Sequence, residues 1–232
     1  AQAFGFTTND EINNMTFYSY KIINRSTSVL NETYFGQWVD PDLGNYLDDY
    51  VGCDVSLGLG YCYNGDADDE GSSGYNYESD DPPPAIGVDF FEGPYQDNDG
   101  IDNPLTTDIS LAKAQLGIPY KGLGIGYGDG VVDNERFGMK RFVYFDRILN
   151  SSIFGDPSTG VEYYNYMRGY WRDNTRFVYG ATGNSSSTGA TTIPTDYCFP
   201  GDSDPYNWGT LGVDPGFDWS EIDPGNGLPS NV

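Results

Sequence analysis

Residues 14–24 read Asn-Met-Thr-Phe-Tyr-Ser-Tyr-Lys-Ile-Ile-Asn, and residues 31–39 read Asn-Glu-Thr-Tyr-Phe-Gly-Gln-Trp-Val. Both stretches are rich in β-branched and aromatic residues, which favour the pleated, half-buried surface of a β-sheet. We therefore expect them to form a long antiparallel pair of strands. This pair sets the expected fold class, a mainly β, antiparallel β-sandwich-like domain.

Further elements are expected along the chain. Residues 85–91 predict a short buried strand, and residues 136–148 predict another strand followed by a turn. Residues 40–84 consist largely of Gly, Asp, Asn and Tyr and end in a run of three prolines, which predicts a long loop region. Because loops of this length are uncommon in a compact domain unless they are held in place, a metal ion or a disulfide is expected to brace them.

One α-helix is predicted, over residues 160–172. Thr159 and Glu162 have the spacing of a capping box, in which each residue satisfies the backbone N–H of the other at the start of a helix. The stripe expected to face the core comprises Val161, Tyr164, Met167, Arg168 and Trp171. Such a stripe is more typical of core packing than of a ligand platform.

The composition limits the function. The 232 residues include 35 Asp and Glu against 11 Lys and Arg, which gives a formal charge of -24. Such a surface repels nucleic acid and anionic lipid, and no apolar stretch is long enough to span a bilayer, so neither nucleic acid binding nor membrane insertion is expected. Aromatic residues make up 16% of the chain and supply the apolar area that folding needs. We expect residues 1–232 to form a single β-rich domain.

The chain has no histidine. This absence excludes a Ser-His-Asp triad, a Cys-His pair and a zinc site of the HExxH type from these residues. The sequence therefore predicts that the protein is not an enzyme. Paired carboxylates could still hydrolyse a glycosidic bond, but among so many acids some pair will have a suitable separation by chance.

The density of carboxylates predicts bound calcium, a hard cation that oxygen ligands coordinate and that relieves their mutual repulsion. The alternative is simple solubility or adaptation to salt. The sharpest cluster surrounds Gly100, and its expected ligands are Asp97, Asp99, Ile101 and Asp102. An acidic turn without metal is the alternative for this loop.

Two further clusters are candidates. Asp129, Asp133 and Glu135 could complete the first site or form a site of their own, and a polar turn before a strand is an equal alternative. Asp40, Asp42 and Asp49 belong to a third cluster, in which five carboxylates fall within residues 40–54. They repel one another unless water or a metal separates them.

The chain has three cysteines. Cys53 and Cys62 are close enough in sequence to close a short loop as a disulfide in an oxidising compartment, which would leave Cys198 unpaired. Alternatively, all three are small buried hydrophobic residues.

Longer phrases of the sequence indicate a family. They are Thr-Asn-Asp-Glu-Ile-Asn-Asn-Met-Thr-Phe-Tyr at 8–18, Gly-Gln-Trp-Val-Asp-Pro-Asp-Leu-Gly at 36–44, Asp-Asp-Tyr-Val-Gly-Cys-Asp-Val at 48–55, Gly-Leu-Gly-Tyr-Cys-Tyr-Asn-Gly-Asp at 58–66, Asp-Phe-Phe-Glu-Gly-Pro-Tyr at 89–95, Asp-Asn-Glu-Arg-Phe-Gly-Met at 133–139 and Phe-Pro-Gly-Asp-Ser-Asp-Pro-Tyr-Asn-Trp-Gly-Thr at 199–210. Together they resemble a family of very large bacterial surface proteins exported by the type IX secretion system. The resemblance extends over nearly the whole chain. It implies an extracellular location at the cell surface and an internal segment without the signal peptide or the C-terminal sorting domain. It brings no catalytic residues.

The expected function is therefore that of a non-catalytic structural or adhesive segment of a secreted cell-surface protein, stabilised by calcium. Its expected partners are other surface or matrix proteins, glycans or further copies of itself. One alternative is a carbohydrate-binding module, because exposed aromatic rings beside carboxylates or calcium are the ingredients of a sugar-binding face. A carboxylate-dependent glycoside hydrolase is the other alternative.

Overall fold

A computed structural model describes residues 1–46, 48–65, 69, 83–96, 98–115, 117–118, 123–145 and 153–222. The chain divides into two compact units, residues 1–33 and residues 34–232, where the sequence predicted a single domain. The structure is mainly β, as predicted. Over the described ranges, its strands form small antiparallel sheets and its helices are short.

The first unit is a β-hairpin. Its strands are β1 (Gln2–Gly5) and β2 (Thr16–Ser19), and the one-turn helix η1 (Glu11–Asn14) lies in the connection between them. Phe4 and Phe17 are opposite each other in the ladder, and their rings stack with centroids 5.5 Å apart. This aromatic pair accounts for the register of the hairpin, because cross-strand ring contacts stabilise antiparallel strands.

The predicted pairing of residues 14–24 with residues 31–39 is wrong. β2 pairs with the strand that precedes it, and residues 31–39 form no strand. Glu32 has a φ of 48°, a left-handed conformation that interrupts an extended chain. Trp38 stacks on Phe145 with ring centroids 4.5 Å apart, so this aromatic residue packs within the second unit instead of alternating across a ladder.

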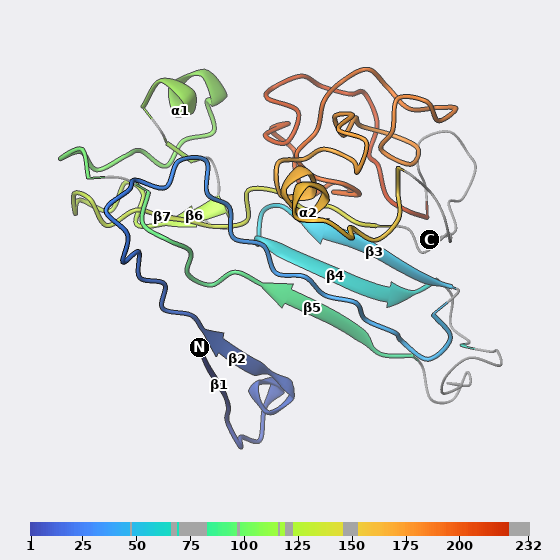
Figure 1. Cartoon of the computed structure of the whole chain (residues 1–232), viewed down its shortest axis with the longest axis horizontal. Helices are drawn as coiled ribbons and strands as arrows, with labels where there is room; N and C mark the ends of the chain where they lie inside the picture. Colours follow the sequence, from blue (N-terminus) through green and yellow to red (C-terminus); the bar gives the residue numbers. More distant parts are fainter. Residues whose placement is uncertain are drawn as a thin grey trace. The chain divides into compact units, whose positions relative to one another are not determined.

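The main sheet of the second unit has three strands in the order β3 (Asp49–Asp54), β4 (Leu59–Asn64) and β5 (Ala85–Asp89), as Figure 1 shows. β5 lies where the sequence predicted a strand over residues 85–91, but most of its residues are exposed where a buried strand was expected. β3 and β4 fall inside residues 40–84, so the prediction of a loop is wrong for this hairpin.

The β3–β4 hairpin has one buried face, which carries mainly small and polar residues. This face comprises Asp49, Val51, Cys53, Gly60, Cys62 and Asn64. The other face carries Tyr50, Tyr61 and Tyr63, which are half-buried. The alternation has the period of two that a strand requires, but glycine and asparagine on the buried face weaken its hydrophobic signal.

The core of the second unit is largely aromatic. One cluster of buried side chains comprises Tyr144, Tyr166, Trp171, Phe177, Tyr179, Cys198, Phe199 and Trp219. A second comprises Cys53, Val55, Ile118, Leu123, Tyr127, Met139 and Tyr197. Phe142 packs against both clusters, and the Cys53 N–H donates to the Phe199 carbonyl at 3.2 Å along the outer edge of β3. The sheet therefore packs against irregular segments, and the predicted sandwich of two sheets is not seen in the described part of the chain.

The predicted helix is present as α2 (Gly160–Met167), and its capping box is confirmed. The Glu162 N–H donates to Thr159 Oγ1 at 3.3 Å, and the Thr159 N–H donates to Glu162 Oε2 at 3.2 Å. The prediction of its buried stripe holds only in part. Trp171 is fully buried, but Val161 is 70% exposed and the buried residues of the helix itself are Asn165 and Tyr166.

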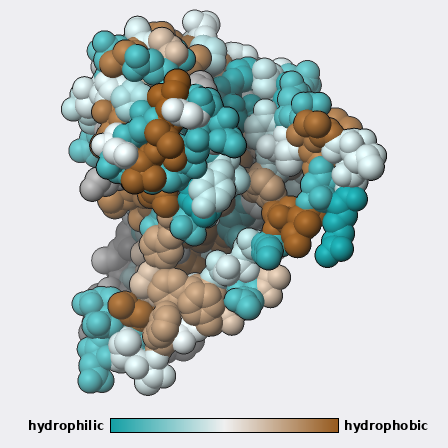
Figure 2. All heavy atoms as spheres, turned by 90° about the vertical axis from the view of Figure 1, so that its left-hand side faces the viewer, coloured by the Kyte–Doolittle hydropathy of each residue, from teal (hydrophilic) through white to brown (hydrophobic). Residues whose placement is uncertain are grey.

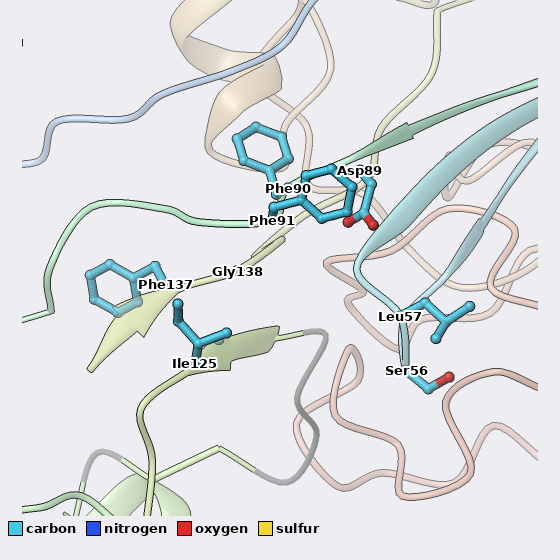
Figure 3. Close-up of a pocket in the computed structure, with 9 residues that line it drawn as sticks. Ser56, Leu57, Asp89, Phe90, Phe91, Ile125, Phe137 and Gly138 are labelled. Atoms are coloured by element: carbon cyan, nitrogen blue, oxygen red, sulfur yellow. The ribbon is translucent and has the colours of Figure 1, made fainter. Parts of the chain in front are cut away.

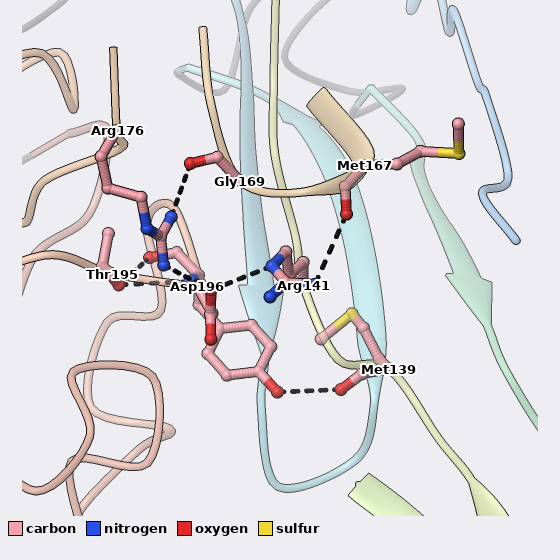
Figure 4. A network of polar contacts seen from close by, with 8 residues as sticks. Met139, Arg141, Met167, Gly169, Arg176, Thr195 and Asp196 are labelled. Carbon is pink, nitrogen blue, oxygen red and sulfur yellow. Dashed lines mark hydrogen bonds and ion pairs between the residues drawn. The ribbon is translucent and has the colours of Figure 1, made fainter. Parts of the chain in front are cut away.

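α2 ends earlier than predicted because the chain reverses at Gly169, which has a φ of 80°. Figure 4 shows the arginines that complete this end of the helix. Arg176 donates to the Gly169 carbonyl at 2.6 Å and to Asp196 Oδ1 at 2.5 Å, and Arg141 donates to the same Asp196 oxygen at 3.0 Å. Two cations therefore share one carboxylate beside the open carbonyl groups of the helix terminus.

The remaining elements lie next to the acidic loops in the sequence. They are α1 (Ile109–Gln115), which was not predicted, and the short antiparallel pair β6 (Gly124–Ile125) and β7 (Arg136–Phe137). β7 covers only the start of the strand predicted over residues 136–148, and the end of that range lies outside the described residues.

Among the described residues, no helix combines the length and the apolar character needed to cross a bilayer.

Apolar side chains are exposed in several places on the surface. Figure 2 shows brown apolar patches between teal polar ones on one face of the molecule.

Candidate metal centre

The two acidic loops around Gly100 and Glu135 lie against each other. The Gln96 N–H donates to the Glu135 carbonyl at 2.9 Å, beside a β-bridge between Tyr95 and Arg136. This short ladder brings the stretch after Gln96 next to the stretch before Glu135. The two loops, which the sequence left open as one site or two, therefore lie next to each other, and Asp97 lies outside the described residues.

Carboxylates hold the two loops together by accepting hydrogen bonds from backbone N–H groups. Asp133 Oδ1 accepts from the Gly100 N–H at 2.8 Å. Asp102 accepts from Gly128 at 2.8 Å through Oδ1 and from Gly130 at 2.7 Å through Oδ2. Both oxygens of Asp102 are thus engaged by the opposite loop.

Other predicted ligands stabilise their own turns. Asp99 Oδ1 accepts from the Ile101 N–H at 2.9 Å, and the Ile101 carbonyl accepts from the Asp133 N–H at 3.4 Å. The hydrogen bond from the Asn134 amide, and then that from the Val131 N–H, lowers the pKa of Asp129. These contacts are the Asx turns that the sequence left open as an alternative to calcium.

Glu135 differs from the other acids of this pair of loops because it is only 1% exposed. Its Oε1 accepts from the Asn103 N–H at 2.6 Å, whereas its Oε2 is buried and has no hydrogen-bond partner among the described residues. The buried Oδ1 of Asn103 also has no partner. A buried carboxylate oxygen without a hydrogen-bond donor costs free energy. A cation or a proton would therefore stabilise the loops most at Glu135 and Asn103.

The third predicted cluster is only partly assembled. Asp40 and Asp42 are exposed, whereas Asp49 is 8% exposed at the start of β3. Asp49 Oδ2 accepts from the Leu43 N–H at 2.9 Å, and its Oδ1 is buried without a partner.

The structure adds two residues to this cluster that the sequence prediction missed. Asp69 is fully buried and its Oδ1 accepts from the Asn45 N–H at 2.7 Å. Glu221 is also fully buried and accepts from the Val51 N–H at 2.5 Å. The run of acids over residues 66–70 was a signal for Asp69, whereas nothing near Glu221 in the sequence points to a site.

Among the acids of this cluster, Asp49 has a strongly raised pKa. Burial raises its pKa from an ordinary 3.8 to about 6, although the hydrogen bond from Leu43 acts in the opposite direction. The negative charges of Asp48, Asp69 and Asp42 raise the pKa further. The carboxylates of this cluster therefore destabilise one another when all are ionised.

Over the described part of the chain, no three Asp, Glu or Cys side chains converge closely enough to hold a metal ion by themselves. A cation in either cluster would therefore need additional oxygens. Calcium accepts backbone carbonyls, side-chain amides and water as well as carboxylates, so both oxygen-rich clusters fit its chemistry.

The disulfide predicted between Cys53 and Cys62 is not present, and all three cysteines are free and buried. Cys53 is opposite Gly60 and Cys62 is opposite Val51, so the two cysteines occupy diagonal positions on one face of the hairpin. Diagonal neighbours are farther apart than the directly opposed pair that a disulfide requires. Burial raises the pKa of each thiol, that of Cys62 to about 12, which suits the alternative of small core residues.

Two pockets among the described residues offer space for a ligand. The first, of about 180 Å³, lies between the end of β5, the turn after β3 and the β6–β7 pair (Figure 3). Phe90, Phe91 and Phe137 line it together with Asp89, whose pKa burial raises. The second, of about 390 Å³, has more acidic walls. Its charged and aromatic lining comprises Tyr179, Tyr197, Asp202, Asp204, Asp214, Phe217 and Asp218.

Comparison of the chain with protein-family models, with curated proteins and with solved structures finds no match in any of the three.

Proposed function

We propose that this chain is a non-catalytic structural or adhesive segment of a large bacterial surface protein, and that calcium bound between its acidic loops stabilises it. The observation that carries the proposal is Glu135, a buried carboxylate with an unpartnered oxygen at the junction of two acidic loops.

The charge balance around Glu135 favours a cation. Asp99, Asp102 and Asp133 belong to the same pair of loops, and the ion pairs found in the described residues involve none of these four acids. A buried carboxylate without a counter-charge is costly, and protonation or a bound cation offsets that cost. In a calcium-containing exterior, calcium is the hard cation whose preferred ligands are such oxygens.

The location and the partners rest on the family resemblance and on charge. A protein exported by the type IX system would act outside the cell, where it meets other surface or matrix proteins, glycans or copies of itself. A formal charge of -24 makes nucleic acid an unfavourable partner.

Carbohydrate binding is the second candidate function. The pocket of about 390 Å³ places Asp202, Asp204 and Asp218 beside Tyr179 and Phe217, and carboxylates with aromatic rings are the groups that bind sugar hydroxyls and ring faces. No observation on this pocket favours hydrolysis of a sugar over its binding. A screen of immobilised glycans with Asp202→Asn, a change at an exposed carboxylate of this pocket, as the matched variant tests this candidate.

The main proposal is tested by titrating calcium into chelator-stripped protein during thermal melting. A ligand that binds only the folded state raises the melting temperature as its concentration rises. Glu135→Gln keeps the shape of the side chain but removes its charge, so this variant should lose much of the calcium-dependent increase. An unchanged melting temperature for the wild-type protein across the titration would refute the proposal.

A further inference from the structure

The third acidic cluster, around Asp49, contains two carboxylates that neighbouring backbone N–H groups anchor. The Leu43 N–H binds Asp49 Oδ2 at 2.9 Å, and the Asn45 N–H binds Asp69 Oδ1 at 2.7 Å. These two backbone nitrogens are two residues apart, and two residues of chain span at most about 7 Å. The same turn therefore holds both carboxylates close together, one from the start of β3 and one from beyond the end of β4.

Each carboxylate keeps one oxygen that accepts no hydrogen bond from the described residues. Asp49 Oδ1 and Asp69 Oδ2 are buried without a hydrogen-bond partner, and the two residues are 8% and 0% exposed. The ion pairs found in the described residues include neither of these acids. Two adjacent buried carboxylates without a counter-charge are unfavourable unless a proton or a cation lies between them.

The surroundings supply oxygen for a cation. Asn64 is opposite Asp49 in the ladder and is buried on the same face, and Glu221 accepts from the backbone N–H of Val51, two residues further along β3. We infer that Asp49 and Asp69 together bind one calcium ion, at a site distinct from the loop pair around Glu135. Amide or carbonyl oxygens and water complete its coordination, because two carboxylates alone do not fill the six to eight positions of calcium.

This ion has a structural consequence. It joins the turn at residues 43–45, the first residue of β3 and Asp69, so it closes the open end of the β3–β4 hairpin. The inference does not depend on calcium at Glu135, because no residue is shared between the two sites.

The test counts calcium bound to the intact chain. Chelator-stripped protein is dialysed against calcium at fixed ionic strength, and the bound metal per chain is measured by elemental analysis. Asp69→Asn, which keeps an oxygen for the Asn45 N–H, should bind one calcium fewer than the wild-type protein. Asp54→Asn is the matched control, because Asp54 lies at the other end of β3 and accepts from the Ser56 hydroxyl and the Leu57 N–H. This control should bind as much calcium as the wild type.

Thermal melting separates a metal ligand from a structural carboxylate. Without calcium, Asp69→Asn should melt at or above the wild-type temperature because it removes one of two like charges, and with calcium it should melt below the wild type. A purely structural Asp69 would lower both temperatures. If Asp69→Asn fails to fold, Asp49→Asn provides the same comparison.

The outcomes also separate the two sites. Asp69→Asn and Glu135→Gln should each remove a different ion, so the double variant should lose two. If Asp69→Asn or its substitute binds as much calcium as the wild type, the inference is overturned and a shared proton explains the pair. Loss of calcium with Asp69→Asn but not with Glu135→Gln would uphold this site and remove the support for the other.

Discussion

At the scale of single residues, glycine determines where the helix α2 stops. Gly169 has a φ of 80°, a backbone conformation that residues with a side chain rarely adopt. A Cβ atom at this position would also collide with Arg176 Nη1. Arg176 in turn links the Gly169 carbonyl to Asp196. Position 169 therefore requires glycine for two reasons: its positive φ, and the space that the Arg176 side chain of the Arg176–Asp196 ion pair occupies.

We predict that Gly169→Ala destabilises the protein by about 1–3 kcal/mol, the range for a strained backbone position. The displaced arginine should add to this cost. Urea denaturation monitored by tryptophan fluorescence measures the free energy of unfolding. Gly160→Ala is the control, because Gly160 lies in the first turn of α2 with open space around its Cα. That change should stabilise the protein by about 0.4–1 kcal/mol. Equal effects of the two changes would contradict the prediction.

At the scale of elements, Glu162 ties α2 to the loop before it. The backbone N–H of Ser158 is the main cause that lowers its pKa, to about 2, and the Ser158 hydroxyl and Arg172 add to the effect. A lowered pKa in the folded state means that the ionised form stabilises the fold. This contribution is complete above the ordinary value of 4.5 and is lost as the pH falls through about 2.

We therefore predict that Glu162→Gln is less stable than the wild-type protein at neutral pH, and that the difference shrinks as the pH falls from about 4.5 toward 2. Urea denaturation of both proteins at a series of pH values measures this difference. A difference that stays constant down to pH 2 would show that the hydrogen bonds survive protonation and that charge is not the cause.

Elements whose signals are local were predictable from the sequence. The capping box of α2 depends on two residues three positions apart, and the short strand β5 follows a run of prolines that leaves the chain extended. The partner of residues 14–24 was not predictable, because several aromatic stretches suit the same strand. The β3–β4 hairpin was missed because its buried face carries glycine, cysteine and asparagine in place of large apolar residues.

In the candidate sites too, residues with a local sequence signal were predictable, and residues that distant contacts bring to the site were not. Asp102, Asp133 and Glu135 could be named as candidates because acids cluster around turns in the sequence, and hydrogen bonds join these turns in the structure. Glu221 was not found, because it reaches Val51 across 170 positions of the chain. No local pattern marks such a residue, and only the packing of the last segment against β3 brings it there.

At the scale of the whole molecule, the two units differ in what they bury. The second unit contains both clusters of buried side chains. In residues 1–33, by contrast, no residue is buried, and the rings of Phe4, Phe6 and Phe17 contact one another at a largely exposed hairpin. A two-stranded hairpin without a covered face is only marginally stable in water.

This contrast predicts a gradient of local stability in the intact chain. Backbone amides of β1 and β2 should exchange with deuterium with little protection, because opening the hairpin exposes almost no further apolar surface. Amides of β4 should be the slowest, because that strand is bonded on both edges and its face is buried. Mass spectrometry of peptides from the full chain after timed exchange measures both. If β1 and β2 were protected as strongly as β4, the exposed rings would have to be covered in solution by a partner, and a second copy of the chain would then be detectable by its dependence on protein concentration.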